Sequence, residues 1–128
     1  MQIPTESELP ILRLLWQSGP LTVREVNDRL NEQSDKAIGY TTTLKLMQLM
    51  AEKGLVTRDT TNRSHVYAAA VPQERTQGTL IDRFVSTAFG GSHSELVLRA
   101  LGNGEATPEE LAKIKQLIAK IEKEEGNG

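Results

Sequence analysis

Four copies of one short pattern, Ser/Thr-x-x-Glu, constrain the fold of this chain most strongly. In this pattern the hydroxyl and the carboxylate each pair with a free backbone N–H at the start of a helix. Each copy precedes a run of apolar residues with helical spacing. The copies are Thr5 with Glu8, Thr22 with Glu25, Ser92 with Glu95, and Thr107 with Glu110. Four such starts in 128 residues predict a mainly α protein.

The apolar spacing and the Gly and Pro breaks divide the chain into six expected helices. They cover residues 6–17, 23–32, 41–53, 73–88, 93–101 and 108–124. After Gly54 the apolar period changes to two, which predicts strands over 55–58 and 65–69 around a polar turn. A very short strand fits residues 21–22. The order helix, strand, helix, helix, hairpin is that of a winged helix-turn-helix.

A change of character at Val71-Pro72 separates two predicted domains. Residues 1–71 form the winged helix-turn-helix domain, with a small β-hairpin as its wing. Residues 72–128 form a helical module whose apolar stripes are too wide for three short helices to bury alone. We therefore expect a symmetric homodimer, although the stripe of the last helix could pack within its own subunit. The expected dimerisation residues are Leu80, Phe84, Leu96, Leu98, Leu101, Leu111, Ile114, Ile118 and Ile121.

The distribution of charge matters more than its sum. The formal net charge of −2 argues weakly against a nucleic-acid partner. Residues 36–67, however, carry five cations and two anions, whereas residues 72–128 carry seven cations and nine anions. The chain is therefore basic in the third helix and the hairpin, and mildly acidic over residues 72–128.

The third helix has a polar side opposite its apolar side. At 100° per residue, Thr41, Lys45 and Gln48 fall together with Glu52. We expect this helix in the major groove of double-stranded DNA and the wing on phosphates. The expected DNA-binding residues are Tyr40, Thr41, Thr42, Lys45, Gln48, Arg63 and Ser64. The polar side could also be an ordinary solvated surface, and the hairpin tip only a turn.

Several kinds of site are excluded or disfavoured. Without cysteine the chain has no disulfide, thiolate metal site or cysteine nucleophile, and two histidines are too few for a metal cluster. It has no Gly-x-Ser-x-Gly turn and no phosphate-binding Gly-rich loop. We expect no enzyme, no metal and no cofactor. No stretch approaches the roughly 18 apolar residues that a transmembrane helix needs, so we expect a cytoplasmic protein without membrane insertion.

Five short segments resemble the BlaI/MecI family of penicillinase-type repressors in their order and spacing. They are the Glu8–Trp16 segment ending in Leu-Leu-Trp, Leu21–Val26, Gly39–Thr42, Lys53–Val56 and Phe89–Ser92. The resemblance covers nearly the full length. It implies a homodimeric bacterial repressor whose winged domains bind an inverted-repeat operator and whose C-terminal helices interlock.

The chain departs from these relatives at three points. In the best-known members a membrane metalloprotease-type sensor triggers cleavage of an Asn-Phe bond, where this chain has Arg99-Ala100. Copper-responsive members carry a Cys-x-Cys signature that a chain without cysteine lacks. Leu49 stands where several relatives have arginine. The resemblance therefore implies a sensor or protease as a further partner, but the inducing signal stays open.

Two other functions remain open at this stage. The first is a winged domain that binds a partner protein instead of DNA, which the net charge of −2 keeps in view. Steeply salt-dependent affinity for random duplex DNA would separate this function from a repressor. The second is a hydrolase or transferase, which is the least favoured of the three functions because the motifs for a nucleophile, a base and a phosphate loop are missing.

Overall fold

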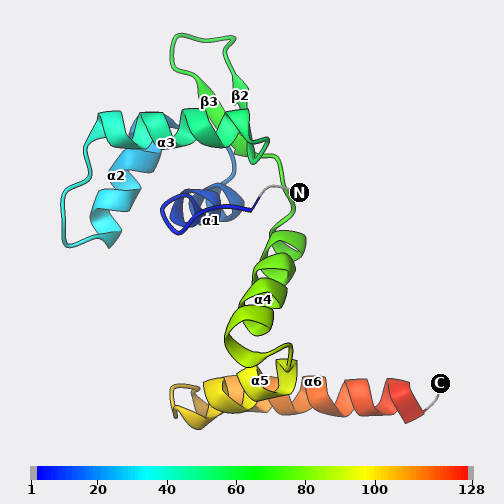
Figure 1. The fold of residues 1–128 in the computed structure, drawn as a ribbon. Coiled ribbons are helices and arrows are strands. Elements are labelled where there is room, and N and C mark those ends of the chain that lie inside the picture. The colour runs from blue at the N-terminus through cyan, green and yellow to red at the C-terminus, as the bar shows by residue number, and fades with distance from the viewer. Residues whose placement is uncertain (1–2, 127–128) are drawn as a thin grey trace. The chain divides into compact units, whose positions relative to one another are not determined.

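The computed structural model describes residues 3–126, which contain six helices and three short strands (Figure 1). The helices are α1 (Leu9–Ser18), α2 (Val23–Gln33), α3 (Tyr40–Glu52), α4 (Gln73–Phe89), α5 (His93–Gly102) and α6 (Pro108–Gly126). The strands are β1 (Leu21–Thr22), β2 (Val56–Asp59) and β3 (Val66–Ala69). The mainly α fold with a small hairpin is confirmed, and most element ends lie within two residues of those predicted.

The start of α1 is the main difference from the prediction. Thr5 and Glu8 exchange both expected hydrogen bonds, at 2.9 and 3.2 Å, but residues 6–8 form a turn and the regular helix begins only at Leu9. The reason is Pro10, whose ring nitrogen has no N–H to donate to the carbonyl four residues earlier. The pair therefore stabilises the turn that leads into α1.

The other three predicted helix starts differ in completeness. Thr22 and Glu25 form both reciprocal hydrogen bonds, and so do Thr107 and Glu110. Ser92 accepts from the Glu95 N–H at 3.3 Å, but the returning bond from the Glu95 carboxylate is absent among the hydrogen bonds of residues 3–126. The α5 start is thus a one-way cap.

The three strands form one antiparallel sheet in the order β1-β3-β2. Leu21 pairs with Tyr67 in the β1–β3 register, and Val56 pairs with Ala69 in the hairpin register. Figure 1 shows the loop of this hairpin projecting beyond α3. The β1–β3 pairing joins the start of α2 to Val66 and Tyr67, the two residues of β3 nearest the hairpin loop.

The core of the first unit lies between α1, α2, α3 and the sheet. Its buried side chains are mostly Leu, Ile, Val and Met, and Tyr67 is the largest of the fully buried ones. Trp16 packs against this core and donates from Nε1 to the Val71 carbonyl oxygen at 3.0 Å. This bond connects α1 to the segment that precedes α4.

The chain divides into two compact units inside α4, with the first unit ending at Ile81 and the second beginning at Asp82. In the second unit, α5 and α6 contain no buried residue among those described. Val85 is the one buried apolar residue that this unit adds to those of the core. Across residues 3–126, no helix is both long enough and apolar enough to cross a membrane.

Candidate nucleic-acid interface

An open groove of about 550 Å³ lies between α3, the start of α2 and the wing. We call it the arginine groove, because Arg24, Arg58 and Arg63 line it. Its remaining lining residues are Thr22, Val23, Tyr40, Leu44, Gln48, Ser64, His65 and Tyr67. No carboxylate is among the described residues that line the groove. In a chain with a net charge of −2, this is a local concentration of positive charge suited to an anion.

Two features of the fold bring Arg24 to this groove. The reciprocal Thr22–Glu25 bonds, at 3.0 and 3.2 Å, start α2 so that Arg24 lies exposed in its first turn. Because Thr22 pairs with Val66 across the sheet, that first turn also lies beside the wing. The Arg24 guanidinium carbon is 5.7 Å from the centre of the Tyr40 ring, within the range of a cation–π contact.

A pair of asparagines on α2 fixes the segment that leads into α3. Asn27 Nδ2 donates to the Ile38 carbonyl oxygen at 3.0 Å and to Thr43 Oγ1 at 2.8 Å. Asn31 Oδ1 accepts from the Ile38 N–H at 2.6 Å, and its Nδ2 donates to the Ile38 carbonyl oxygen at 3.0 Å. We call Asn27 and Asn31 the asparagine pair. It sets where α3 begins relative to α2, because it contacts residues on both sides of the helix start at Tyr40.

The other end of α3 is held by a partly buried ion pair. Lys53 Nζ lies 2.8 and 2.9 Å from the two carboxylate oxygens of Glu8, whose side chain is 2% exposed. Burial alone would raise the pKa of Glu8, but hydrogen bonds from Lys53 and Thr5 and the Lys53 charge lower it overall. Gly54 follows with a φ of +81°, a conformation that favours glycine at a helix end. The start of α3 is therefore fixed by side chains of α2, and its end by Glu8 from the turn before α1.

The structure brings four of the seven predicted DNA-binding residues together in the arginine groove. They are Tyr40, Gln48, Arg63 and Ser64. Thr41 and Lys45 are exposed on the side of α3 opposite the buried Thr43, Met47 and Met50. Thr42 is also exposed, but it borders a different hollow, lined by Leu30, Ile38 and Leu46 among others. The predicted residues thus form an outer face and a groove, with Thr42 on the far flank.

Seven of the eleven lining residues of the groove are not among the predicted site residues, and three of these seven are basic side-chain types, namely Arg24, Arg58 and His65. Arg58 contributed to the count of local charge but was not named as a site residue. A signal for Arg24 was present, because it directly follows a strong helix start in a short strand–helix connection. Leu49, the departure from the relatives, is 40% exposed and lies on the outer side of α3.

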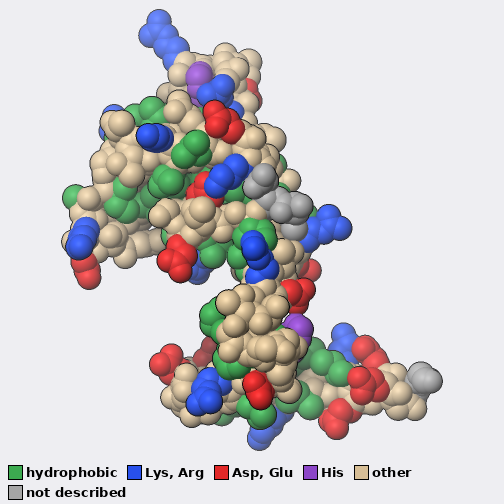
Figure 2. Space-filling model, viewed as in Figure 1, with side chains coloured by type: hydrophobic (Ala, Val, Ile, Leu, Met, Phe, Trp, Pro, Cys, Tyr) green, Lys and Arg blue, Asp and Glu red, His purple; other side chains and the backbone are tan. Residues whose placement is uncertain are grey.

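The wing tip is shaped by a short-range turn. Asp59 accepts hydrogen bonds from the Thr61 hydroxyl and from the Thr61 N–H, the latter at 2.9 Å. These two bonds, the hydroxyl one first, lower the pKa of Asp59. Figure 2 shows Lys and Arg side chains projecting over the hairpin (Figure 2). The one acidic side chain of β2 is thus engaged in the turn and does not line the arginine groove.

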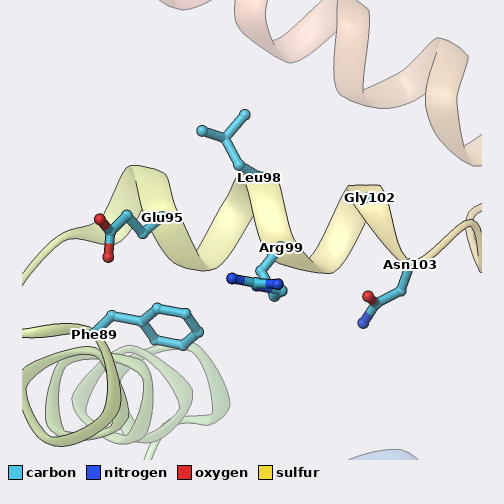
Figure 3. A pocket seen from close by; sticks show the side chains of 6 residues that line it. All are labelled: Phe89, Glu95, Leu98, Arg99, Gly102 and Asn103. Carbon is cyan, nitrogen blue, oxygen red and sulfur yellow. The ribbon is translucent and has the colours of Figure 1, made fainter.

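The second unit exposes the residues predicted for dimerisation. Phe84, Leu98, Leu111, Ile118 and Ile121 are between 39% and 70% exposed, and Leu96, Leu101 and Ile114 are half-buried. Leu98 is the most exposed of them, and in Figure 3 its side chain leaves α5 on the side away from Phe89 (Figure 3). Arg99 and Asn103 instead point to the side of Phe89, where they line a shallow pocket. Leu80, the remaining predicted residue, is half-buried and belongs to the first unit.

A three-helix unit with a three-stranded sheet, in which a β-hairpin follows the third helix, is a winged helix-turn-helix. A structure of H. salinarum RosR shares this fold with a TM-score of 0.54 at 14% identity, over 91% of this chain and 92% of that one. The solution structure of the DNA-binding domain of the repressor BlaI aligns with a TM-score of 0.49 at 18% identity, over 55% of this chain and 83% of that one.

The family follows from the sequence comparison. The penicillinase repressor family model matches residues 4–120, so the chain belongs to this family of transcriptional regulators, which are not enzymes. The transcriptional regulator BlaI of Mycobacterium tuberculosis is 28% identical over 122 residues, which is 94% of this chain and 86% of that protein. The family predicted from the five short segments is confirmed.

Proposed function

We propose that the protein is a homodimeric repressor that binds an inverted-repeat DNA operator. In this proposal the outer side of α3, with Thr41, Lys45 and Gln48, enters the major groove. The arginine groove beside it receives the phosphates of one strand. The family of transcriptional regulators to which the chain belongs supports this function.

The composition of the arginine groove is the observation that carries the proposal. Three arginines from α2, β2 and the wing loop line it, together with hydroxyl and amide side chains and no carboxylate among the described residues. Arginine suits phosphate because its guanidinium stays charged and offers donors in a planar fork. A docking surface for a protein partner would have less need of such an unmixed charge, since protein interfaces pair charges of both signs.

The exposed apolar side chains of α6 support the homodimer. Leu111, Ile114, Ile118 and Ile121 recur at intervals of three, four and three residues, so they form one stripe along the helix. Three of the four are more than a third exposed. A second copy related by a twofold axis would cover such a stripe on both chains. It would also present two α3 helices, as an inverted repeat requires.

The test is a titration with random duplex DNA at several salt concentrations, followed by fluorescence anisotropy. We expect affinity to fall steeply with salt, because bound phosphates release counterions. Arg63→Ala is expected to weaken binding to all sequences and to flatten the salt slope by about one unit. Arg13→Ala is the matched control, because Arg13 is an exposed arginine of the same unit that does not line the arginine groove.

Two outcomes would contradict the proposal. Affinity for duplex DNA that is absent or independent of salt would favour the protein-interaction function instead. An equal effect of Arg63→Ala and Arg13→Ala would mean that the arginine groove has no special part in binding. Selection of binding sites from a random pool would then give the operator, which we expect to contain two inverted half-sites.

A further inference from the structure

The arginine groove contains a histidine, His65, which is exposed and lies directly before β3. Histidine is the side-chain type that ordinarily changes charge between pH 5 and 8. Arginine and tyrosine, the other ionisable side-chain types that line the groove, ordinarily do not change charge in that range. Histidine is therefore the one side-chain type among the described lining residues that can be either neutral or cationic near neutral pH.

His65 shares the arginine groove with three arginines and with no carboxylate among the described lining residues. The charged and titratable groups that share its groove are Arg24 from α2, Tyr40 from α3, Arg58 from β2, Arg63 from the loop and Tyr67 from β3. Asp59 is the wing carboxylate nearest in sequence, but it accepts hydrogen bonds from Thr61 and does not line the groove. Among the described lining residues, none offers a negative charge to an imidazolium.

We propose that DNA binding by this protein takes up a proton at His65. The proposal rests on the proposed function, because the phosphate that enters the arginine groove is the anion that stabilises the imidazolium. A protonated His65 then acts as a fourth cation of the groove, beside the three arginines. Since binding and protonation are linked, affinity for DNA increases as the pH falls.

The expected size follows from the uptake of at most one proton. Between pH 8 and pH 6, at constant and low salt, we expect the Kd of the wild-type protein for a random duplex to fall roughly 3- to 10-fold. The salt slope is expected to become steeper by about 0.9 at the lower pH, as for one additional phosphate contact.

The chain supplies a matched control, because it has two histidines. The second, His93 in α5, lies 3.0 Å from Asp82 and belongs to the other unit. His65→Gln is expected to abolish the pH dependence, so that its Kd for the random duplex is the same at pH 8 and pH 6. His93→Gln is expected to keep the pH dependence. His65→Arg, with its permanent charge, is expected to show at pH 8 the affinity that the wild type has at pH 6.

The same titrations separate failure of this inference from failure of the proposed function. Salt-dependent binding with no change in wild-type affinity between pH 8 and pH 6 would overturn the role of His65 and leave the proposed function intact. An equal pH dependence in the wild type and in His65→Gln would do the same. No salt-dependent binding at any pH would overturn both.

Discussion

Removal of the Asn27 side chain is expected to destabilise the first unit and to loosen the start of α3. In Asn27→Ala, the hydrogen bonds to the Ile38 carbonyl oxygen and to Thr43 Oγ1 are both lost. Asn31 still donates to the Ile38 carbonyl oxygen, so this loss costs only about 1 kcal/mol. Thr43 is fully buried, and a hydroxyl left there without its partner costs about 1–3 kcal/mol. The expected loss in the free energy of unfolding is therefore about 2–4 kcal/mol.

Two further variants distinguish the loss of the Asn27 hydrogen bonds from a general loss of packing. Asn31→Ala exposes the Ile38 N–H in a partly buried place that water can reach, and we expect a smaller cost of about 1–2 kcal/mol. Thr43→Val keeps the shape and removes the hydroxyl. The double variant Asn27→Ala/Thr43→Val is expected to be less destabilised than the sum of its parts, with a coupling of about 1 kcal/mol.

Urea unfolding followed by Trp16 fluorescence measures these energies, because Trp16 is the only tryptophan and packs on the core of the first unit. An unchanged m value would show that the same surface unfolds in each variant. If Asn27→Ala cost less than about 0.5 kcal/mol, or if Asn27 and Thr43 showed no coupling, the hydrogen bonds would not be what fixes the start of α3.

Three other predictions concern α3, its C-terminal ion pair and α6. Lys45→Ala is expected to weaken operator binding by about 1–3 kcal/mol if Lys45 reads a guanine, and competition with operator variants would show a loss of discrimination at one base pair. Glu8→Gln is expected to cost about 2 kcal/mol near pH 7, because Lys53 keeps a partner without charge. Since folding lowers the pKa of Glu8 below its usual 4.5, that contribution is present above pH 4.5 and disappears as the pH falls below it. Urea midpoints of the two proteins that stay equally far apart down to pH 3 would refute this assignment. Ile118→Glu is expected to give monomers in sedimentation, whereas Gln116→Glu, on the opposite side of α6, is expected to leave the dimer intact; equal behaviour of the two would count against the stripe as the interface.

The element order could be predicted because its signals are local. A hydroxyl and a carboxylate three residues apart mark a helix start, and Gly54 with its positive φ marks the end of α3. The same local rule explains the error at α1, since the Thr5–Glu8 pair forms in the turn before the helix. Whether the regular helix begins at the pair or later depends on Pro10, whose missing N–H delays it.

The contacts that shape the candidate site could not be predicted in the same way, because they join distant residues. Arg24 lies beside the wing only because β1 pairs with β3, a strand that begins more than 40 residues after Arg24. Asn27 and Asn31 pair with the backbone of Ile38, eleven and seven residues later, and this requires a particular path of the α2–α3 connection. The helical period predicts which residues lie on the outer side of α3. The opposite wall of the arginine groove depends on how the strands pair in the sheet.

The position of the acids explains how a chain with net charge −2 can present a cationic groove. Backbone and hydroxyl hydrogen bonds at helix starts lower the pKa of Glu25 and Glu110, so these carboxylates are charged and act as caps. Asp59 shapes the wing turn, and Glu8 pairs with Lys53. Each of these anions accepts hydrogen bonds from a neighbouring residue, and none lines the arginine groove. Because the Debye length at physiological salt is about 8 Å, a phosphate at the groove responds mainly to the groove's own arginines. The net charge of the chain is therefore a poor guide to its partner, and the local set of side chains is the better one.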